Sequence, residues 1–273
     1  MPALSLLLLL PLLALVGWLA RARRLRGARR RRIHDVLLQT NSGDDCFLAD
    51  TLDALPFPAE KYLRHALVPG APLPRSADIR LRGTLRVGPD DWVPFEARER
   101  VNAERGFVWE SRIGVVGRMM LEGAEWLLVD EAGAAYALAD WVPAVERNGP
   151  ELARSAAGRL LVDLAWLPAA LTPQRGARWS RGDNQRAVVT IPGHATPMTV
   201  AIRDDGRLLE VSLLRRRVGP DGRSSLASYG MVVEADARFG DLTVPSELVF
   251  AWGIGTDDRY DFMRVVVESI DWL

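Results

Sequence analysis

The sequence predicts a mainly β protein of the α+β class. We expect a curved antiparallel sheet or open half-barrel that is covered by a central helix and preceded by N-terminal helices and a transmembrane anchor. Three observations predict this: residues 3–20 are apolar and uncharged, residues 150–171 form the longest helical pattern after them, and nearly all other periodic stretches alternate as strands. Because short turns join most of these strands, neighbours are expected to pair antiparallel.

The first 20 residues are interpreted as a transmembrane anchor. Residues 3–20 form an uncharged run of 18 residues, the lower end of what spans a hydrocarbon core of about 30 Å. Eight arginines follow between Arg21 and Arg32, with no acidic residue among them. The positive-inside rule places such a cluster in the cytoplasm. The sequence therefore predicts a single-pass protein of the inner membrane, with an arginine-rich juxtamembrane segment over residues 21–43 and a cytoplasmic domain.

The arginine cluster also dominates the charge balance. The 273 residues include 35 basic and 35 acidic ones, so that without the cluster 27 basic residues oppose the 35 acidic ones. Such a body has no positive field to attract nucleic acid, and we expect no nucleic-acid partner. We expect the segment Arg21–Arg32 to bind anionic lipid headgroups, at about 1 kcal/mol per well-placed arginine. The single cysteine, Cys46, has no disulfide partner and is interpreted as a small buried thiol.

Residues 44–273 are expected to form one β-rich domain. Two short helices, over residues 44–55 and 59–67, are predicted before the proline-rich stretch 68–74. The predicted strands cover residues 79–87, 95–101, 107–113, 115–121, 125–130, 134–141, 184–191, 198–203, 207–218, 226–235, 246–252 and 260–272.

The clearest pair of strands is the hairpin of residues 95–101 and 107–113. If Val101 pairs with Phe107, Arg98 falls opposite Glu110, and a second charge pair matches in the same register: Glu96 with Arg112. The opposite face then carries one acid, Glu99, in an otherwise apolar surface. We expect Glu99 to lie near an edge of the sheet or to pair with a group from another element.

The central helix is expected to lie across the sheet as a lid. Pro150 suits the first helical position, and Pro168 biases the residue before it away from helical angles. Between them, Leu160, Leu161 and Leu164 recur at the spacing of three and four residues that a buried stripe requires.

No catalytic or metal-binding motif occurs. Glycine-rich nucleotide loops, nucleophile elbows, zinc-protease motifs and paired Cys-x-x-Cys motifs are all missing, and the three histidines have no metal-ligand spacing. The sequence therefore predicts no metal, no cofactor and no catalytic residue.

Eight tryptophans lie outside the predicted anchor, many for a domain of this size. Core packing is the more frequent role of such residues, but aromatic surface that faces a hollow suits an apolar ligand. Our hypothesis is a noncatalytic domain that binds an apolar or lipid-like ligand on the curved sheet. A structural or partner-binding module of the inner membrane, with a sheet filled by its own side chains, is the alternative, and an enzyme is third. The predicted ligand-binding residues are Trp109, Leu160, Leu161, Leu164, Trp166 and Trp252.

Several stretches resemble an uncharacterised bacterial family of unknown function with a hydrophobic anchor. They include LPFPAEKYLRHAL over residues 55–67, WVPFEARE over 92–99 and the helix that begins ELAR at Glu151 and ends with Trp166 and Pro168. Members of that family tend to have glutamate where this chain has Asp163. The order of strands and helix is also similar to the half-barrels of Lol-type lipoprotein carriers, which hold acyl chains between a curved sheet and helices. That similarity implies an architecture rather than a function.

Overall fold

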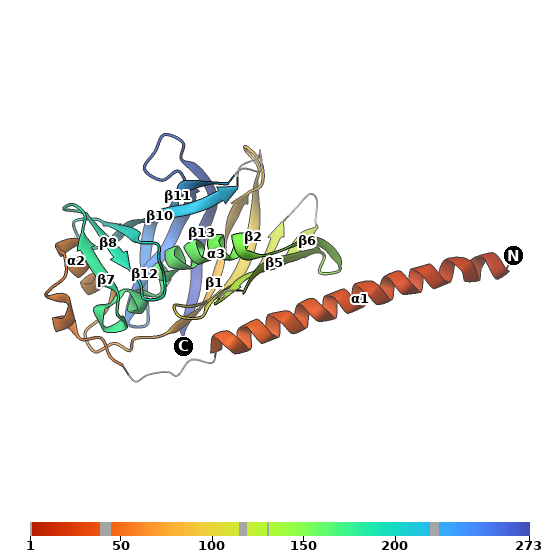
Figure 1. Cartoon of the computed structure of the whole chain (residues 1–273), viewed down its shortest axis with the longest axis horizontal. Helices are drawn as coiled ribbons and strands as arrows, with labels where there is room; N and C mark the ends of the chain where they lie inside the picture. The colour runs from red at the N-terminus through yellow and green to blue at the C-terminus, as the bar shows by residue number, and fades with distance from the viewer. Residues whose placement is uncertain (1, 39–44, 115–118, 130, 219–223) are drawn as a thin grey trace.

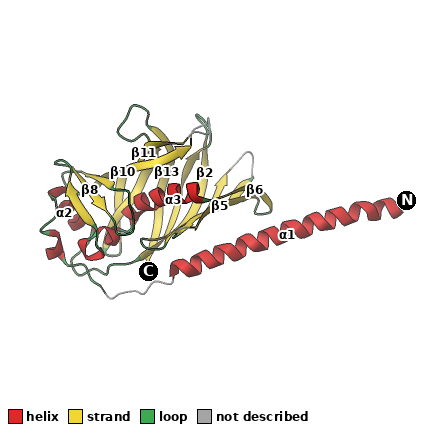
Figure 2. Cartoon of the chain, in the orientation of Figure 1, coloured by secondary structure: helices red, strands yellow, loops and turns green. Residues whose placement is uncertain are grey.

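The structure is a computed structural model that describes residues 2–38, 45–114, 119–129, 131–218 and 224–273, with the side chains of the first helix described from residue 11 onward. It confirms a mainly β protein with a single open antiparallel sheet of 13 strands (Figures 1 and 2). The strands are β1 (Ser76–Arg86), β2 (Trp92–Asn102), β3 (Gly106–Gly114), β4 (Met120–Leu128), β5 (Glu131–Leu138), β6 (Val142–Asn148), β7 (Arg178–Arg181), β8 (Arg186–Thr190), β9 (Met198–Ile202), β10 (Leu208–Val218), β11 (Ser224–Phe239), β12 (Leu242–Trp252) and β13 (Tyr260–Trp272).

The sheet consists of two meanders that meet in the middle. The strand order is β6-β5-β4-β3-β2-β1-β13-β12-β11-β10-β9-β8-β7, so the first and last strands pair at the centre and β6 and β7 form the two edges. Helix α3 (Pro150–Asp163) leaves one edge strand and, through three short turns, leads to the other. The chain thus crosses one face of the sheet, which we call the inner face, and α3 lies along it (Figure 1). The predicted lid helix is confirmed.

The hairpin register is also as predicted. Val101 lies opposite Phe107 and Arg98 opposite Glu110 between β2 and β3. Alternation along β3 then turns Phe107 and Trp109 to the inner face, where they join the main core, and Val108 to the outer face.

Among the strands of the described residues, the two at the edges of the sheet were not predicted. β6 has the sequence VPAVERN and β7 has RWSR. Proline, charges and short length are typical of edge strands, because these features discourage pairing with another chain. The same features remove the apolar alternation by which a strand is recognised in a sequence. The predicted strand over residues 115–121 lies mostly outside the described residues, and β4 begins at Met120.

Two of the expected helices are shorter than predicted. The central α-helix ends at Asp163 and continues as the 3-10 turns η2 (Leu164–Trp166), η3 (Pro168–Leu171) and η4 (Pro173–Arg175), because prolines cannot continue the α-helical hydrogen bonds. The helix expected over residues 44–55 is wrong beyond the turn η1 (Ala49–Leu52), since Cys46 forms a β-bridge with Pro72 and holds the chain extended. Helix α2 (Phe57–Ala66) lies close to its predicted place.

Helix α1 (Pro2–Leu38) is continuous and extends far beyond the sheet (Figure 1). Its last turns pack on the outer face, where Ile33 and Leu37 contact a small apolar cluster with Trp126. Within the part of the chain that the structure describes, no helix combines the length and the apolarity needed to cross a bilayer, so the anchor expected over residues 3–20 is not supported. The side chains of residues 1–10, and residues 39–43 of the expected juxtamembrane segment, lie outside the described residues.

The predicted arginine cluster has two sides. One side faces the sheet: Arg23 and Arg30 form ion pairs with Asp140 at 2.6 and 3.8 Å, and Arg29 pairs with Glu146 at 3.5 Å. The Arg26 guanidinium donates to the carbonyl of Asp140 at 2.9 Å. The four remaining arginines are exposed on the other side of the helix: Arg21, Arg24, Arg31 and Arg32. Half of the cluster therefore binds the protein itself.

Candidate functional site

The first group of functional side chains lies between α3 and the inner face. Arg159 of α3 is buried and donates hydrogen bonds to Glu125 of β4 at 2.5 Å, to Asp163 at 3.1 Å and to Glu99 of β2 at 3.5 Å. The spacing of four residues places Arg159 and Asp163 on one side of the helix. These four residues are called the inner cluster.

The inner cluster rests on an aromatic floor. The guanidinium of Arg159 lies 4.8 Å from the ring centre of Phe107 and 5.0 Å from that of Trp109, within the range of cation–π interactions. Both rings come from β3, which pairs with the strand of Glu99. Glu99, the acid on the apolar face of the predicted hairpin, thus pairs with a residue of another element. This was one of the two alternatives expected from the sequence.

The charges of the inner cluster do not balance. Three carboxyl groups face one guanidinium, and Glu99 and Asp163 each have one buried oxygen without a hydrogen-bond partner among the described residues. Burial, followed by repulsion from Asp163, raises the pKa of Glu99 well above its usual value. Burial also raises the pKa of Asp163, against the attraction of Arg159. Both shifts favour the protonated forms of these acids relative to exposed carboxyl groups, and the hydrogen bonds of Arg159 tie α3 to the sheet.

Five of the six predicted ligand-binding residues are packed into the same core. Trp109, Leu160, Leu161, Leu164 and Trp166 are buried around α3, with Leu161 only 2% exposed. The indole nitrogen of Trp166 donates to the carbonyl of Pro245 at 3.1 Å. The sixth residue, Trp252 of β12, is partly buried and packs on Tyr229 with ring centres 4.9 Å apart. Tyr229 and Phe250 connect it to Trp166. The structure brings the six residues into one apolar region, and their binding role stays a prediction.

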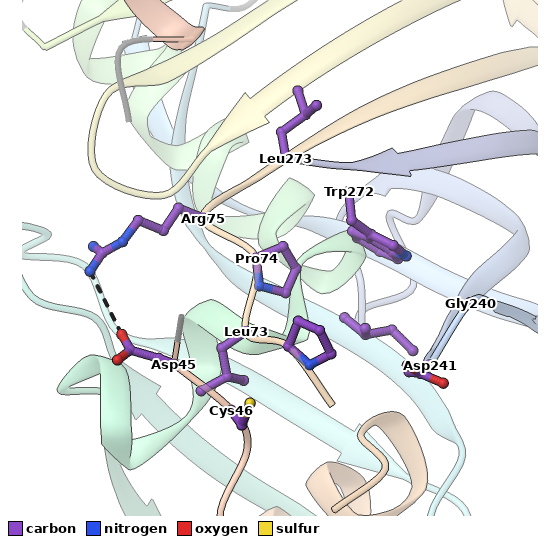
Figure 3. A pocket seen from close by; sticks show the side chains of 11 residues that line it. Asp45, Cys46, Leu73, Pro74, Arg75, Gly240, Asp241, Trp272 and Leu273 are labelled. Carbon is purple, nitrogen blue, oxygen red and sulfur yellow. Dashed lines mark ion pairs between the residues drawn. The ribbon is translucent and has the colours of Figure 1, made fainter. Parts of the chain in front are cut away.

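A pocket of about 470 Å³ opens at the end of the sheet where β1 begins and β13 ends (Figure 3). We call it the basal pocket. Most of its wall is apolar, and the indole nitrogen of Trp272 donates to the carbonyl of Phe239 at 2.9 Å, which fixes that ring. The lining residues are Asp45, Cys46, Pro72, Leu73, Pro74, Arg75, Gly240, Asp241, Leu242, Trp272 and Leu273.

Cys46 lines this pocket and is exposed, so its interpretation as a buried thiol was wrong. The bridge between Cys46 and Pro72 keeps the segment at the surface of the domain. Sequence reasoning also missed the basal pocket as a whole. Its wall combines a proline-rich connection, a turn between β11 and β12 and the end of β13, and such connections carry no periodic signal.

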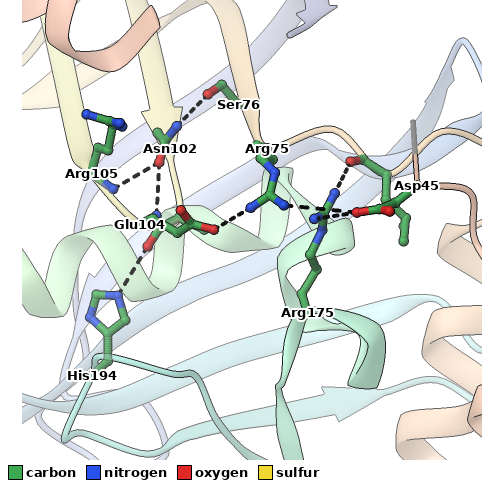
Figure 4. Close-up of polar contacts among 10 residues, drawn as sticks. Asp45, Arg75, Ser76, Asn102, Glu104, Arg105, Arg175 and His194 are labelled. Atoms are coloured by element: carbon green, nitrogen blue, oxygen red, sulfur yellow. Dashed lines mark hydrogen bonds and ion pairs between the residues drawn. The ribbon is translucent and has the colours of Figure 1, made fainter. Parts of the chain in front are cut away.

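Two arginines meet at one side of the basal pocket (Figure 4). Arg175 donates to the Oδ2 atom of Asp45 at 3.0 Å and to the carbonyl of Leu73 at 2.6 Å. Arg75 lies 4.0 Å from the same Oδ2 atom and donates to Glu104 at 2.6 Å. Burial, and then the charge of Arg75, lower the pKa of Arg175. Asp45, Arg75, Glu104 and Arg175 are called the basal cluster, and a second pocket of about 220 Å³ lies between its arginines and Ile191.

The turn between β2 and β3 positions Glu104 in this cluster. The side-chain oxygen of Asn102 accepts hydrogen bonds from the backbone N–H groups of Glu104 and Arg105, both at 2.9 Å. The amide nitrogen of Asn102 donates to Ser76 at 2.7 Å, and both residues are buried. The buried Asn102 side chain therefore holds the backbone of this turn, and Arg75 pairs with the exposed carboxylate of Glu104 that follows it (Figure 4).

The described residues contain no group of three or more histidine, cysteine, aspartate or glutamate side chains placed to hold a metal ion. Both clusters offer ion pairing, and the raised pKa values of Glu99 and Asp163 favour proton binding in the inner cluster.

Comparison with known proteins gives a family and a group of structural neighbours, of which two are described. A family of unknown function, DUF6544, matches residues 45–264, which confirms the predicted resemblance to such a family. A LolA superfamily protein from Nitrosomonas europaea is 10% identical, with 83% of this chain and 94% of that chain covered and a TM-score of 0.43. A putative outer membrane lipoprotein-sorting protein domain from Vibrio parahaemolyticus is 9% identical, with 72% and 85% covered and a TM-score of 0.40. Among curated proteins, none matches the sequence.

Proposed function

This chain belongs to the DUF6544 family, and we propose that it is a noncatalytic domain that binds an apolar or lipid-like ligand. The basal pocket is the observation that carries the proposal. Its volume of about 470 Å³ falls within the range of small-molecule sites, roughly 300–1,000 Å³. Leucine, proline and tryptophan side chains form most of its wall, with Asp45 and Arg75 at one side and Asp241 at the other (Figure 3). This combination is the form expected of a site for a ligand with an apolar part.

The pocket lies away from the residues that the sequence assigned to binding. Leu160, Leu161 and Leu164 fill the space beneath α3, so a ligand there would have to displace core side chains at the cost of their packing. The basal pocket requires no such displacement. We therefore propose the basal pocket as the binding site, and the space beneath α3 is the alternative location.

We also propose that α1 attaches the domain to the inner membrane, with the domain on the cytoplasmic side. Exposed apolar side chains on α1, among them Leu12, Leu13 and Trp18, support this attachment. The exposed arginines Arg21, Arg24, Arg31 and Arg32 follow them and suit anionic headgroups. A reporter that is active only in the periplasm, fused after Leu273, is expected to stay silent, and periplasmic activity would overturn the proposed sidedness.

The only cysteine provides the test of ligand binding. Because Cys46 lines the basal pocket and is exposed, a bound ligand should slow its reaction with a maleimide. We would titrate the purified protein with a fluorescent fatty acid and follow both the fluorescence and the rate of modification. The variant Cys46→Trp, which adds bulk at the pocket wall, should abolish saturable binding, whereas Leu161→Ala should leave it unchanged.

The outcomes of this titration distinguish a ligand in the basal pocket from a ligand beneath α3, and both from a protein that binds no ligand. Saturable binding that protects Cys46 supports the basal pocket. Saturable binding that leaves the modification rate unchanged and weakens in Leu161→Ala moves the ligand beneath α3. If no saturable binding occurs, and native mass spectrometry of detergent-extracted protein finds no co-purifying lipid, the proposal fails and a structural or partner-binding module remains.

A further inference from the structure

The basal cluster aims two cationic groups at one point beside the basal pocket. Arg175 donates to the carbonyl of Leu73, and Arg75 donates to the exposed carboxylate of Glu104, so one nitrogen of each arginine is already engaged. The other terminal nitrogens, Nη1 of Arg175 and Nη2 of Arg75, lie 3.0 and 4.0 Å from the same oxygen of Asp45. This oxygen marks a position that an anion prefers.

Asp45 holds that position from the solvent side. Its side chain is 56% exposed, whereas the side chains of Arg75 and Arg175 are 29% and 13% exposed. Exposed ion pairs contribute little net stability, because water solvates the separated charges nearly as well. A second carboxylate or a phosphate can therefore replace Asp45 at little cost to the fold. Guanidinium groups suit these anions, since their fork geometry matches two oxygens at once.

The apolar pocket adjoins the same position. Asp45 and Arg75 belong to its wall together with Leu73, Leu242 and Trp272 (Figure 3). One molecule that places an anionic group on the arginines thus has its other end beside an apolar cavity. On this juxtaposition we propose that the ligand is an amphiphile with an anionic head, and that the Asp45 carboxylate occupies the place of that head in the ligand-free protein. The inference rests on the proposed function and adds the class of ligand to it.

Pairs of ligands that differ only in the head test this inference. Dodecanoate, dodecyl phosphate and 1-dodecanol share one tail, and each can be measured by protection of Cys46 from a maleimide. Arg175→Gln should weaken the anionic ligands by roughly tenfold or more, the worth of one hydrogen bond to a charged group. It should leave 1-dodecanol unchanged. Arg82→Gln, an exposed arginine that pairs with Glu268 away from the pocket, is the matched control and should change neither.

Asp45→Asn should raise the affinity for anionic ligands, and a purely structural role of Asp45 would not produce this increase. Removing the resident carboxylate should tighten the anionic ligands several-fold and leave 1-dodecanol unchanged. This variant keeps the test decisive even where Arg175→Gln unfolds. An effect on one anion alone identifies its headgroup as carboxylate or phosphate, and either result supports the inference.

Two results would contradict the proposals in distinguishable ways. If 1-dodecanol and both anions protect Cys46 alike in every variant, the anionic head is wrong and the apolar site stands. If none of the three ligands protects Cys46, the basal site itself is wrong.

Discussion

The inner cluster and the basal cluster use the same residue types in opposite environments. Arg159 is 8% exposed and meets three carboxyl groups beneath α3, whereas Asp45 of the basal cluster is 56% exposed beside an open pocket. Charges interact strongly where water is excluded, but bringing them there is costly, so an interior cluster cannot lose one partner without leaving an uncompensated charge. At the surface the same contact is weak and exchangeable. Burial of the carboxylates, more than composition, decides whether an arginine–carboxylate group holds the fold or is open to a ligand, since Arg159 and Arg175 are themselves 8% and 13% exposed.

Removing one arginine from each cluster should give the largest difference between them. Arg159→Met deletes a buried guanidinium and leaves Glu99, Glu125 and Asp163 facing one another, so we expect a loss of about 3–5 kcal/mol in the free energy of unfolding. Arg175→Met should cost about 1–2 kcal/mol, because water reaches its partner Asp45 and the main loss is the hydrogen bond to the carbonyl of Leu73. Urea denaturation measures both. Equal losses would show that the two environments do not differ as the exposures suggest.

Truncating one leucine near each cluster should affect stability and ligand binding differently. Leu161 packs within the core, so Leu161→Ala should cost about 2–5 kcal/mol. Leu73 is equally buried, at 2% exposed, but its side chain also borders the basal pocket, so Leu73→Ala should fall in the lower part of that range. Thermal or urea unfolding gives the stabilities, and protection of Cys46 gives the binding. We expect binding to change in Leu73→Ala alone, and a change in Leu161→Ala alone would locate the ligand beneath α3.

The pH dependence of stability should show the buried acids directly. Burial raises the pKa of Glu99 in the folded protein above its value of about 4.3 in the unfolded chain. The contribution of Glu99 to the free energy of unfolding is therefore fully present below about pH 4.3 and is lost as pH rises through the folded pKa. Asp78 of β1 behaves in the opposite way. Burial opposes its charge, but hydrogen bonds from Arg98 and Arg100 outweigh burial and lower its pKa. Its contribution is present above about 3.9 and is lost as pH falls through the folded pKa.

Urea unfolding from pH 3 to pH 9 separates these two acids. Glu99→Gln should remove part of the loss of stability on the alkaline side. Asp78→Asn should remove part of the loss on the acid side. A Glu99→Gln variant whose stability keeps the parent's slope above pH 5 would show that the inner cluster does not retain a proton.

The sequence predicted those parts of the molecule that repeat. Alternation located the strands, and charge matching set the register of β2 and β3, because one face of each strand is buried and a slip by one residue would reverse it. The edge strands β6 and β7 have no buried face of that kind and were missed. The basal pocket was missed for a related reason, since its wall comes from connections whose path depends on the rest of the fold.

The inner cluster was half visible in the sequence. Glu99 stood out as an acid on an apolar strand face, which requires a partner when it is buried. Arg159 and Asp163 are four residues apart in the predicted lid helix and enclose the apolar residues Leu160, Leu161 and Val162. An acid inside an apolar strand face requires a cationic partner, and an arginine next to the apolar residues of the covering helix is the candidate that the sequence offered.

The smallest expected effect concerns the hairpin pair that the sequence proposed. Arg98 does lie opposite Glu110 in the register, but its guanidinium donates two hydrogen bonds to Asp78 of the neighbouring strand, at 2.6 and 2.7 Å. Glu110 instead lies 3.2 Å from His34 and 4.0 Å from Arg30, both on α1. Each partner of the proposed pair is thus taken by another element.

Two double-mutant cycles rank these contacts. The coupling of Arg98 with Asp78 should be about 1 kcal/mol, because Asp78 is buried while Arg98 is half exposed, an environment between those of the inner and basal clusters. The coupling of Arg98 with Glu110 should be below about 0.5 kcal/mol, since only a solvent-screened attraction remains between them. Alanine variants in urea measure both cycles. A coupling to Glu110 that exceeds the coupling to Asp78 would mean that cross-strand position, and not burial of the acid, governs how strongly an arginine of this sheet binds its partner.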